Sequence, residues 1–314
     1  MKSLLRFVAA CVLLLALAIG ARRLFETPAA IPPPGPGEKD TVVDEVRWRS
    51  REVEGRGDVT IVFVHGLMAS SESWRKVLSA ASGGRPAIAV DLPGFGHSAR
   101  PWPQDSTYGG QAAALLAFLD RRRIGRAALV GNSLGGATAM AVAAARPARI
   151  AALVLVDTPS SSWEMPWTLR LLRAPLVGEV AGELACRPLF AWGLRHVLFA
   201  RGDRVTEEAA DAYWRPITVP GTRRAALAAA RSSQAGFDRL EAAVRAPTLV
   251  LWGREDRLIP ARTGLLLSDR IPGAKLVVLP GAGHVPQEEA PEAFAREVAV
   301  FLDEALGPAG EPRR

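Results

Sequence analysis

The sequence predicts an α/β fold, with a mostly parallel central sheet flanked by helices and interrupted by a helical insertion. Short apolar runs alternate with helical patterns along the chain, which is typical of strands that are covered on both faces. Residues 158–246 break this rhythm, because they contain no clear strand pattern. The length of 314 residues and the hydrophobic content of 49% allow one large core of this kind.

The expected elements follow from these runs. Residues 42–48 alternate and predict an early strand or one arm of a hairpin. The short apolar runs predict buried strands, and segments between them predict helices. We expect strands over 59–64, 87–90, 127–130, 151–156, 248–252 and 276–279, and helices over 110–122, 134–145 and 291–306.

Charge and cysteine content exclude several kinds of partner. The formal net charge is +7, but residues 1–23 hold four bases and no acid. No long basic face is left, so we expect no nucleic-acid partner. The 2 cysteines, Cys11 and Cys186, are too few for a disulfide framework or a thiolate metal site.

Residues 7–21 form an uninterrupted apolar run that begins after Arg6. As a helix this run would be about 22 Å long, and residues 4–5 lengthen it enough to cross a hydrocarbon core of roughly 30 Å. A cleaved signal peptide is the alternative, because residues 18–20 are small enough for a cleavage site. We expect a single N-terminal membrane anchor with the catalytic domain outside the cytoplasm, or a secreted or periplasmic protein after cleavage.

The chain divides accordingly into segments. Residues 1–23 are expected to be the hydrophobic anchor or signal segment, and residues 24–40 a linker rich in Pro and Gly. Residues 41–157 and 247–314 are expected to form the α/β core. Residues 158–246 are expected to form the helical insertion.

The segment from Gly131 to Gly135 has the pattern G-x-S-x-G between a predicted strand and a predicted helix. This is the context of a nucleophile elbow, in which a strained turn holds a serine hydroxyl above the sheet. The glycines are needed because side chains at those positions would collide with the neighbouring backbone. Ser133 is therefore the candidate nucleophile, and it requires a base and an orienting acid.

The candidate base is one of 4 histidines. His284 follows the last predicted strand, on a loop that could reach a serine at a strand end. His65 and His97 follow earlier strands and are expected to shape loops by hydrogen bonding. His196 lies in the insertion, where packing or exposure to solvent is expected.

The candidate acid follows a strand between the serine and the histidine. Asp256 follows the penultimate strand, Asp157 ends the strand over 151–156, and Glu255 is a weaker rival. Spacing alone does not choose between them. For the oxyanion, the backbone N–H groups of Leu67 and Leu134 are the expected donors, and each such donor lowers the barrier by roughly 3 kcal/mol.

Residues 94–99 match the dinucleotide pattern G-x-G-x-x-A, but Pro101 and Pro103 follow at once, so the motif does not open a helix. We therefore expect no nicotinamide or flavin site. The sequence also has no Walker motif and no plausible metal cluster, so no cofactor is expected.

Taken in order, these motifs resemble the α/β-hydrolase fold family over about residues 59–306. The resemblance implies that Ser133 is the nucleophile, Asp256 the acid and His284 the base, and that the insertion is a helical cap over the site. The matching motifs are His65-Gly66 with Trp74, residues 91–98, residues 131–136, residues 253–256 with Pro260, and Gly283-His284 with Pro286 and Glu289.

Family members differ in chemistry. Haloalkane dehalogenases and epoxide hydrolases carry Asp where this chain has Ser133. The chain also resembles carbon–carbon bond hydrolases of aromatic ring-cleavage pathways, which usually have Met after the serine and an aromatic residue after the histidine. Here Leu134 and Val285 occupy those positions. Cofactor-free haloperoxidases share the same triad.

We therefore expect a serine hydrolase that cleaves a small carboxylic ester with an apolar acyl or alcohol group through an acyl-enzyme. The alternatives are a carbon–carbon bond hydrolase of the ring-cleavage type, a cofactor-free haloperoxidase, and a non-enzymatic binding module on a hydrolase fold. The N-terminal segment would provide contact with a membrane.

Overall fold

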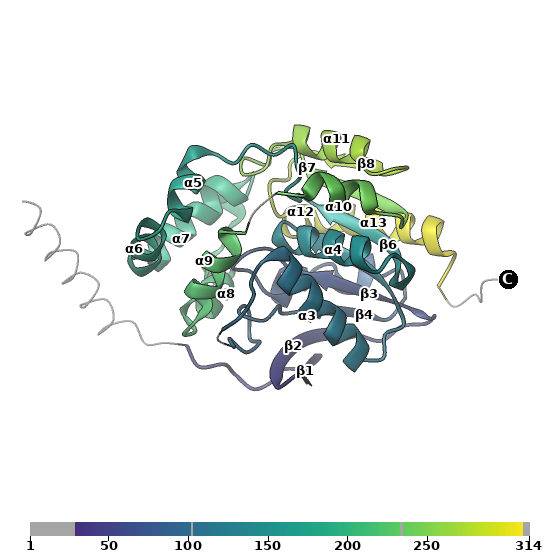
Figure 1. Cartoon of the computed structure of the whole chain (residues 1–314), viewed down its shortest axis with the longest axis horizontal. Helices are drawn as coiled ribbons and strands as arrows, with labels where there is room; N and C mark the ends of the chain where they lie inside the picture. Colours follow the sequence, from purple (N-terminus) through teal and green to yellow (C-terminus); the bar gives the residue numbers. More distant parts are fainter. Residues whose placement is uncertain (1–28, 102, 233–234, 310–314) are drawn as a thin grey trace, which may run out of the picture.

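The computed structural model describes residues 29–101, 103–232 and 235–309, and its centre is an eight-stranded sheet (Figure 1). The strands are β1 (Glu38–Val43), β2 (Val46–Val53), β3 (Val59–Val64), β4 (Ala87–Val90), β5 (Arg126–Asn132), β6 (Ile150–Val156), β7 (Thr248–Gly253) and β8 (Lys275–Leu279). Their order across the sheet is β1-β2-β4-β3-β5-β6-β7-β8. β1 pairs antiparallel with β2 and β2 with β4, whereas all pairings from β4 to β8 are parallel.

Two apolar clusters lie on opposite faces of this sheet, because alternate residues of a strand point to opposite sides. In β3, Val62 and Val64 belong to one cluster, and Ile61 and Phe63 belong to the other. The first cluster is covered by α3 (Tyr108–Arg121), α4 (Leu134–Ala145), α10 (Phe237–Ala243) and α11 (Ala261–Arg270), and the second by α2 (Leu78–Ala81) and α13 (Pro291–Leu306).

The expected helical insertion contains α5 (Trp167–Arg173), α6 (Val177–Leu184), α7 (Arg187–Gly193), α8 (Glu207–Thr218) and α9 (Thr222–Ala230). The described part of residues 158–246 holds no strand. Figure 1 shows α5 to α9 grouped beside the sheet, whereas α10 packs against α4 and α11 of the core.

Several predicted limits agree with the structure and others do not. β3, β4, α4 and α13 begin and end at the predicted residues. β1 begins at Glu38, inside the segment expected to be a linker. This strand is held to β2 by Arg49, whose buried guanidinium donates to Asp40 at 2.5 Å and to Glu38 at 2.9 Å. The turn of the hairpin consists of Asp44 and Glu45, both with positive φ.

The predicted N-terminal anchor, residues 1–23, lies outside the described residues. Within the described residues, no helix combines the length and the apolar character that a membrane span requires.

Candidate active site

Ser133 lies at the sharp turn between β5 and α4, with φ 53° and ψ −117°. This conformation is strained for a residue other than glycine, and such strain is concentrated at functional sites. The flanking glycines are required because the neighbouring backbone leaves no room for a side chain at these positions. A Cβ on Gly131 would lie 2.4 Å from the carbonyl oxygen of Gly135, and a Cβ on Gly135 would lie 2.1 Å from that of Val64. The strand–turn–helix geometry of a nucleophile elbow is therefore present.

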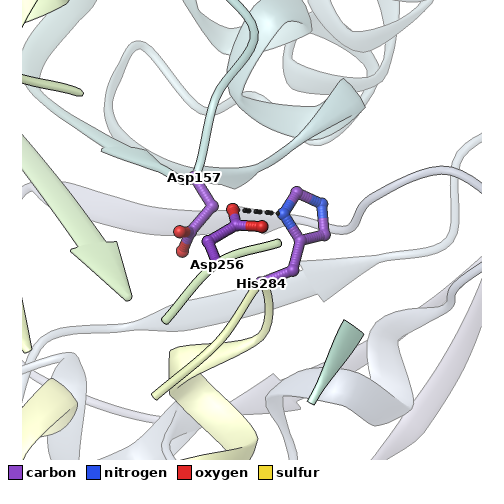
Figure 2. Close-up of side chains that lie close together, drawn as sticks. All are labelled: Asp157, Asp256 and His284. Carbon is purple, nitrogen blue, oxygen red and sulfur yellow. Dashed lines mark hydrogen bonds and ion pairs between the residues drawn. The ribbon is translucent and has the colours of Figure 1, made fainter. Parts of the chain in front are cut away.

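His284 and Asp256 form a buried hydrogen-bonded pair (Figure 2). The Nδ1 atom of His284 lies 2.7 Å from one carboxylate oxygen of Asp256. The other oxygen accepts the backbone N–H groups of Leu258 and Ile259, at 2.7 and 2.9 Å. Burial acts to raise the pKa of Asp256, but the interactions with His284, the N–H of Ile259 and the carboxyl group of Asp157 together hold this pKa below its usual value. Asp256 is thus ionised and its orientation is fixed.

The histidine loop is bonded to the elbow through Asn132. Its side-chain amide donates to the backbone carbonyl of His284 at 3.1 Å and to that of Val156 at 3.3 Å. Gly66 lies on another side of the same turn, because a Cβ at this position would lie 3.3 Å from Cβ of Ser133. Leu67 follows Gly66, so the structure brings together the elbow, the histidine loop and the segment expected to donate to an oxyanion.

The rival acids occupy different places. Asp157 is fully buried and accepts the backbone N–H of Gly253 at 3.0 Å. Burial, followed by the nearby charge of Asp256, raises the pKa of Asp157 well above its usual value. Glu255 accepts the N–H of Gly281 at 2.9 Å and so holds the loop before His284. Of the three acids, the one hydrogen-bonded to the imidazole is Asp256.

A metal ion fits this group poorly. Donor atoms of Asp157, Asp256 and His284 lie within 4.8 Å of one another. The facing atoms of His284 and Asp256 are already bonded to each other, and the second oxygen of Asp256 is occupied by two N–H donors. The hydrogen bonds therefore occupy the atoms of Asp256 and His284 that an ion would need, and they leave one buried oxygen of Asp157 without a partner among the described residues.

The other histidines have local bonds. Nε2 of His65 accepts the N–H of Leu92 at 3.0 Å, so its Nδ1 carries the proton and donates to the carbonyl of Gly66 at 2.7 Å. His196 stacks on Trp192 in the insertion, with ring centroids 4.9 Å apart. The segment 94–99, which resembles a dinucleotide motif, contains no helix and wraps the carboxylate of Asp91, which accepts the N–H of His97 at 2.6 Å.

Sequence reasoning missed a set of contacts between the insertion and the histidine loop. The carboxylate of Glu289, in α12 (Pro286–Glu289), accepts the N–H of Gly283 at 2.7 Å and that of Ala200 at 2.7 Å. Arg257 donates to two carbonyl oxygens of the insertion, at residues 196 and 199. Glu289 belongs to the sequence motif that begins at Gly283-His284, but nothing in the sequence shows which distant N–H groups its carboxylate binds.

The chain matches the family model described as "alpha/beta hydrolase fold" over residues 59–291. It is a member of that family. It is therefore an enzyme of the α/β-fold hydrolase class, as the motifs predicted.

Relatives and solved structures agree with this assignment. The chain is 32% identical to 2-hydroxymuconate semialdehyde hydrolase from Pseudomonas sp. strain CF600, over 78% of this chain and 87% of the relative. Two solved structures under 25% identical support the fold. One is a meta-cleavage product hydrolase from Pseudomonas fluorescens IP01, with TM-score 0.72, 24% identity, and coverage of 85% of this chain and 98% of that one. The other is a protein from Acinetobacter baumannii AYE described as "a putative lipase", with TM-score 0.72, 23% identity, and coverage of 85% of this chain and 91% of that one.

These comparisons correct the predicted location. The expectation of membrane anchorage by a single N-terminal segment is contradicted by the similarity to 2-hydroxymuconate semialdehyde hydrolase, which extends over 87% of that relative. The expectation was wrong because the length and apolarity of residues 7–21 and the charges beside them do not by themselves establish an anchor.

Proposed function

We propose that the chain is a serine hydrolase in which Ser133 attacks a carbonyl carbon. His284 takes the proton of Ser133, and Asp256 orients His284 and stabilises its cation. The backbone N–H groups of Leu67 and Leu134 are proposed to stabilise the oxyanion. The observation that supports this proposal best is the buried 2.7 Å contact between His284 and Asp256, on a loop that is bonded to the elbow.

For the substrate, we propose a conjugated oxo acid of the ring-cleavage type, from which a carbon–carbon bond is hydrolysed. The relative with 32% identity supports this class. After Ser133 attacks the carbonyl carbon, the bond between this carbon and the adjacent carbon of the leaving fragment breaks. The electron pair passes into the conjugated carbonyl system of the leaving fragment, which takes the proton from His284. Water then hydrolyses the acyl-enzyme to a carboxylic acid.

Hydrolysis of an apolar ester is the second candidate, because of the residues beside the proposed nucleophile and base. Leu134 and Val285 are both buried, and Val285 packs with insertion residues that include Leu194 and Phe199. Ring-cleavage hydrolases usually carry Met and an aromatic residue at these two positions. An aliphatic wall favours an apolar acyl or alcohol group.

The division into domains also remains a proposal. We propose residues 24–40 as a linker, residues 41–157 and 247–314 as the core, and residues 158–246 as a cap over the site. Within that last segment, the packing of α10 on α4 and α11 favours a cap that ends before Phe237.

One preparation of the full chain tests these proposals. Labelling with a fluorophosphonate, followed by peptide mapping, should modify Ser133 and no other serine, and absence of labelling would contradict the serine mechanism. The same protein is then assayed with a conjugated ring-cleavage oxo acid and with p-nitrophenyl esters from acetate to hexanoate. Higher kcat/KM for the oxo acid supports the first class. Preference for the longer esters, which gain about fourfold per buried methylene, supports the second.

A further inference from the structure

A second carboxyl group lies directly behind the proposed acid. Figure 2 shows the carboxyl group of Asp157 beside that of Asp256, on the side away from the imidazole of His284. Donor atoms of the three side chains lie within 4.8 Å of one another, and Asp157 is 0% exposed. The mechanism proposed above gives Asp157 no role.

The hydrogen bonds of Asp157 are too few for an ionised carboxylate. One oxygen accepts the N–H of Gly253, and the other oxygen is buried without a hydrogen-bond partner among the described residues. By contrast, Asp256 accepts two backbone N–H groups and the imidazole. A buried charge needs such donors, and two adjacent carboxylates in one buried site do not both ionise.

We propose that Asp157 is a positioning residue that stays protonated and donates its proton toward Asp256, so that a single negative charge supports His284. The inference rests on the proposed role of Asp256 as the acid. A proton on the unpartnered oxygen of Asp157 turns that oxygen into a hydroxyl donor. The hydroxyl then donates to the ionised carboxylate of Asp256. The pair then carries one charge, which is the amount needed to stabilise one imidazolium.

The backbone conformation and hydrogen bonds of Asp157 fix the position of its carboxyl group. Asp157 has a φ of 44°, an uncommon conformation for a residue other than glycine. Its own N–H donates to the carbonyl of Leu251 in β7 at 3.1 Å, while its side chain accepts the N–H of Gly253 from the same strand. These two bonds hold the carboxyl group at the end of β6, against the segment that carries Asp256.

The ionisable groups around Asp157 also oppose its ionisation. Asp256 faces it across the pair, and Glu289 contributes further negative charge. Both oppose a charge on Asp157, and burial is the largest cause of its raised pKa. Only the bond from Gly253 favours the ionised form. His284 contacts the carboxylate of Asp256 and not that of Asp157 in the described structure.

Infrared difference spectroscopy of the full chain at neutral pH tests the protonation state without relying on activity. The difference between wild type and Asp157→Asn should contain the C=O stretching band of one protonated carboxylic acid. The matched control, Asp58→Asn, changes an aspartate whose side chain is 83% exposed and should not remove that band. Absence of the band from the wild-type minus Asp157→Asn difference would overturn the proposal, even if Ser133 proved to be the nucleophile.

A pair of variants tests the positioning role through the rate of fluorophosphonate labelling measured across pH. Asp157→Ala removes the donor and should slow labelling about tenfold, and Asp157→Asn supplies an N–H donor and should restore most of that loss. The acid limb of the profile should lie at the same pH in Asp157→Asn and wild type. A limb displaced to lower pH would show that Asp157 was ionised and had been supporting the His284 cation directly. Equal losses in both variants with an unchanged limb would indicate a structural role only. Either result overturns the proposal.

Discussion

The backbone N–H of His284 donates a 2.8 Å hydrogen bond to the carbonyl oxygen of Leu198 in the insertion. The loop that carries the proposed base is therefore bonded directly to the proposed cap. Two further contacts lie beside this bond, from Glu289 to the N–H of Ala200 and from Arg257 to the carbonyl of Phe199. Movement of residues 196–200 would disturb the position of the imidazole.

Replacing Glu289 with Gln should loosen this connection. The carboxylate accepts N–H groups on both oxygens, from Gly283 and from Ala200. An amide NH₂ cannot accept, so one buried N–H loses its partner at a cost of about 1–3 kcal/mol. We expect faster proteolysis within residues 158–246 and a drop in kcat/KM of about tenfold or more.

The control for this prediction is Glu292→Gln, the same chemical change at an exposed position in the first turn of α13. It should leave both proteolysis and kcat/KM at wild-type values. Equal behaviour of the two variants would show that Glu289 does not connect the insertion to the histidine loop.

Gly283→Ala should disturb the same contact through sterics. A Cβ on Gly283 would lie 2.6 Å from the carbonyl oxygen of Leu198 and 2.7 Å from the nitrogen of Ala200, and both are backbone atoms. The backbones must separate, so we expect a lower Tm and lower activity. Gly193→Ala is the control, because nothing lies within 4 Å of its Cβ and alanine favours a helix by roughly 0.5–1 kcal/mol. A Gly283→Ala protein with wild-type Tm and activity would contradict the contact.

The core of the fold could be predicted from the sequence because its strands are buried on both faces. β4 is a continuous apolar run and β3 is interrupted only by Thr60, and the limits of both strands were predicted correctly. The strand expected over 42–48 crosses the hairpin turn, because residues 42–43 end β1 and residues 46–48 begin β2. The start of β1 was missed because this edge strand, EKDTVV, begins with polar side chains. Its place depends on ion pairs that Arg49 of β2 makes across the hairpin with Glu38 and Asp40, and the pattern of apolar residues does not show these pairs.

The candidate site could be predicted only in part for a similar reason. Asp157 and Asp256 follow β6 and β7, which are neighbours in the sheet, with Val156 paired with Leu251. Both acids therefore end at the same edge, and spacing along the chain could not choose between them. The choice depends on side-chain direction, which places Asp256 on the imidazole and Asp157 behind it.

Two replacements of Ser133 should separate activity from stability. Both Ser133→Ala and Ser133→Gly should lower turnover by roughly 10⁴- to 10⁶-fold if the serine is the nucleophile. Glycine tolerates the φ of 53° and alanine does not, so the glycine variant should be more stable by about 1 kcal/mol in chemical unfolding. Retained activity in either variant would show that Ser133 is not the nucleophile. A glycine variant less stable than the alanine variant would show that the backbone at this position is not strained.

Asp256→Asn should affect both catalysis and the pH dependence of stability. The asparagine leaves His284 poorly oriented and its cation unsupported, so kcat should fall by about 10⁴-fold. The pKa of Asp256 in the folded chain is lowered from 3.8, so its ionised form stabilises the fold above that pH, and this contribution is lost as the pH falls through the lowered pKa. Urea unfolding from pH 6 downward should therefore show a shallower acid loss of stability in Asp256→Asn than in wild type. The surface change Asp58→Asn should keep the wild-type slope. A variant that matched wild type in both kcat and acid slope would show that Asp256 is neither the acid nor an ionised partner of His284.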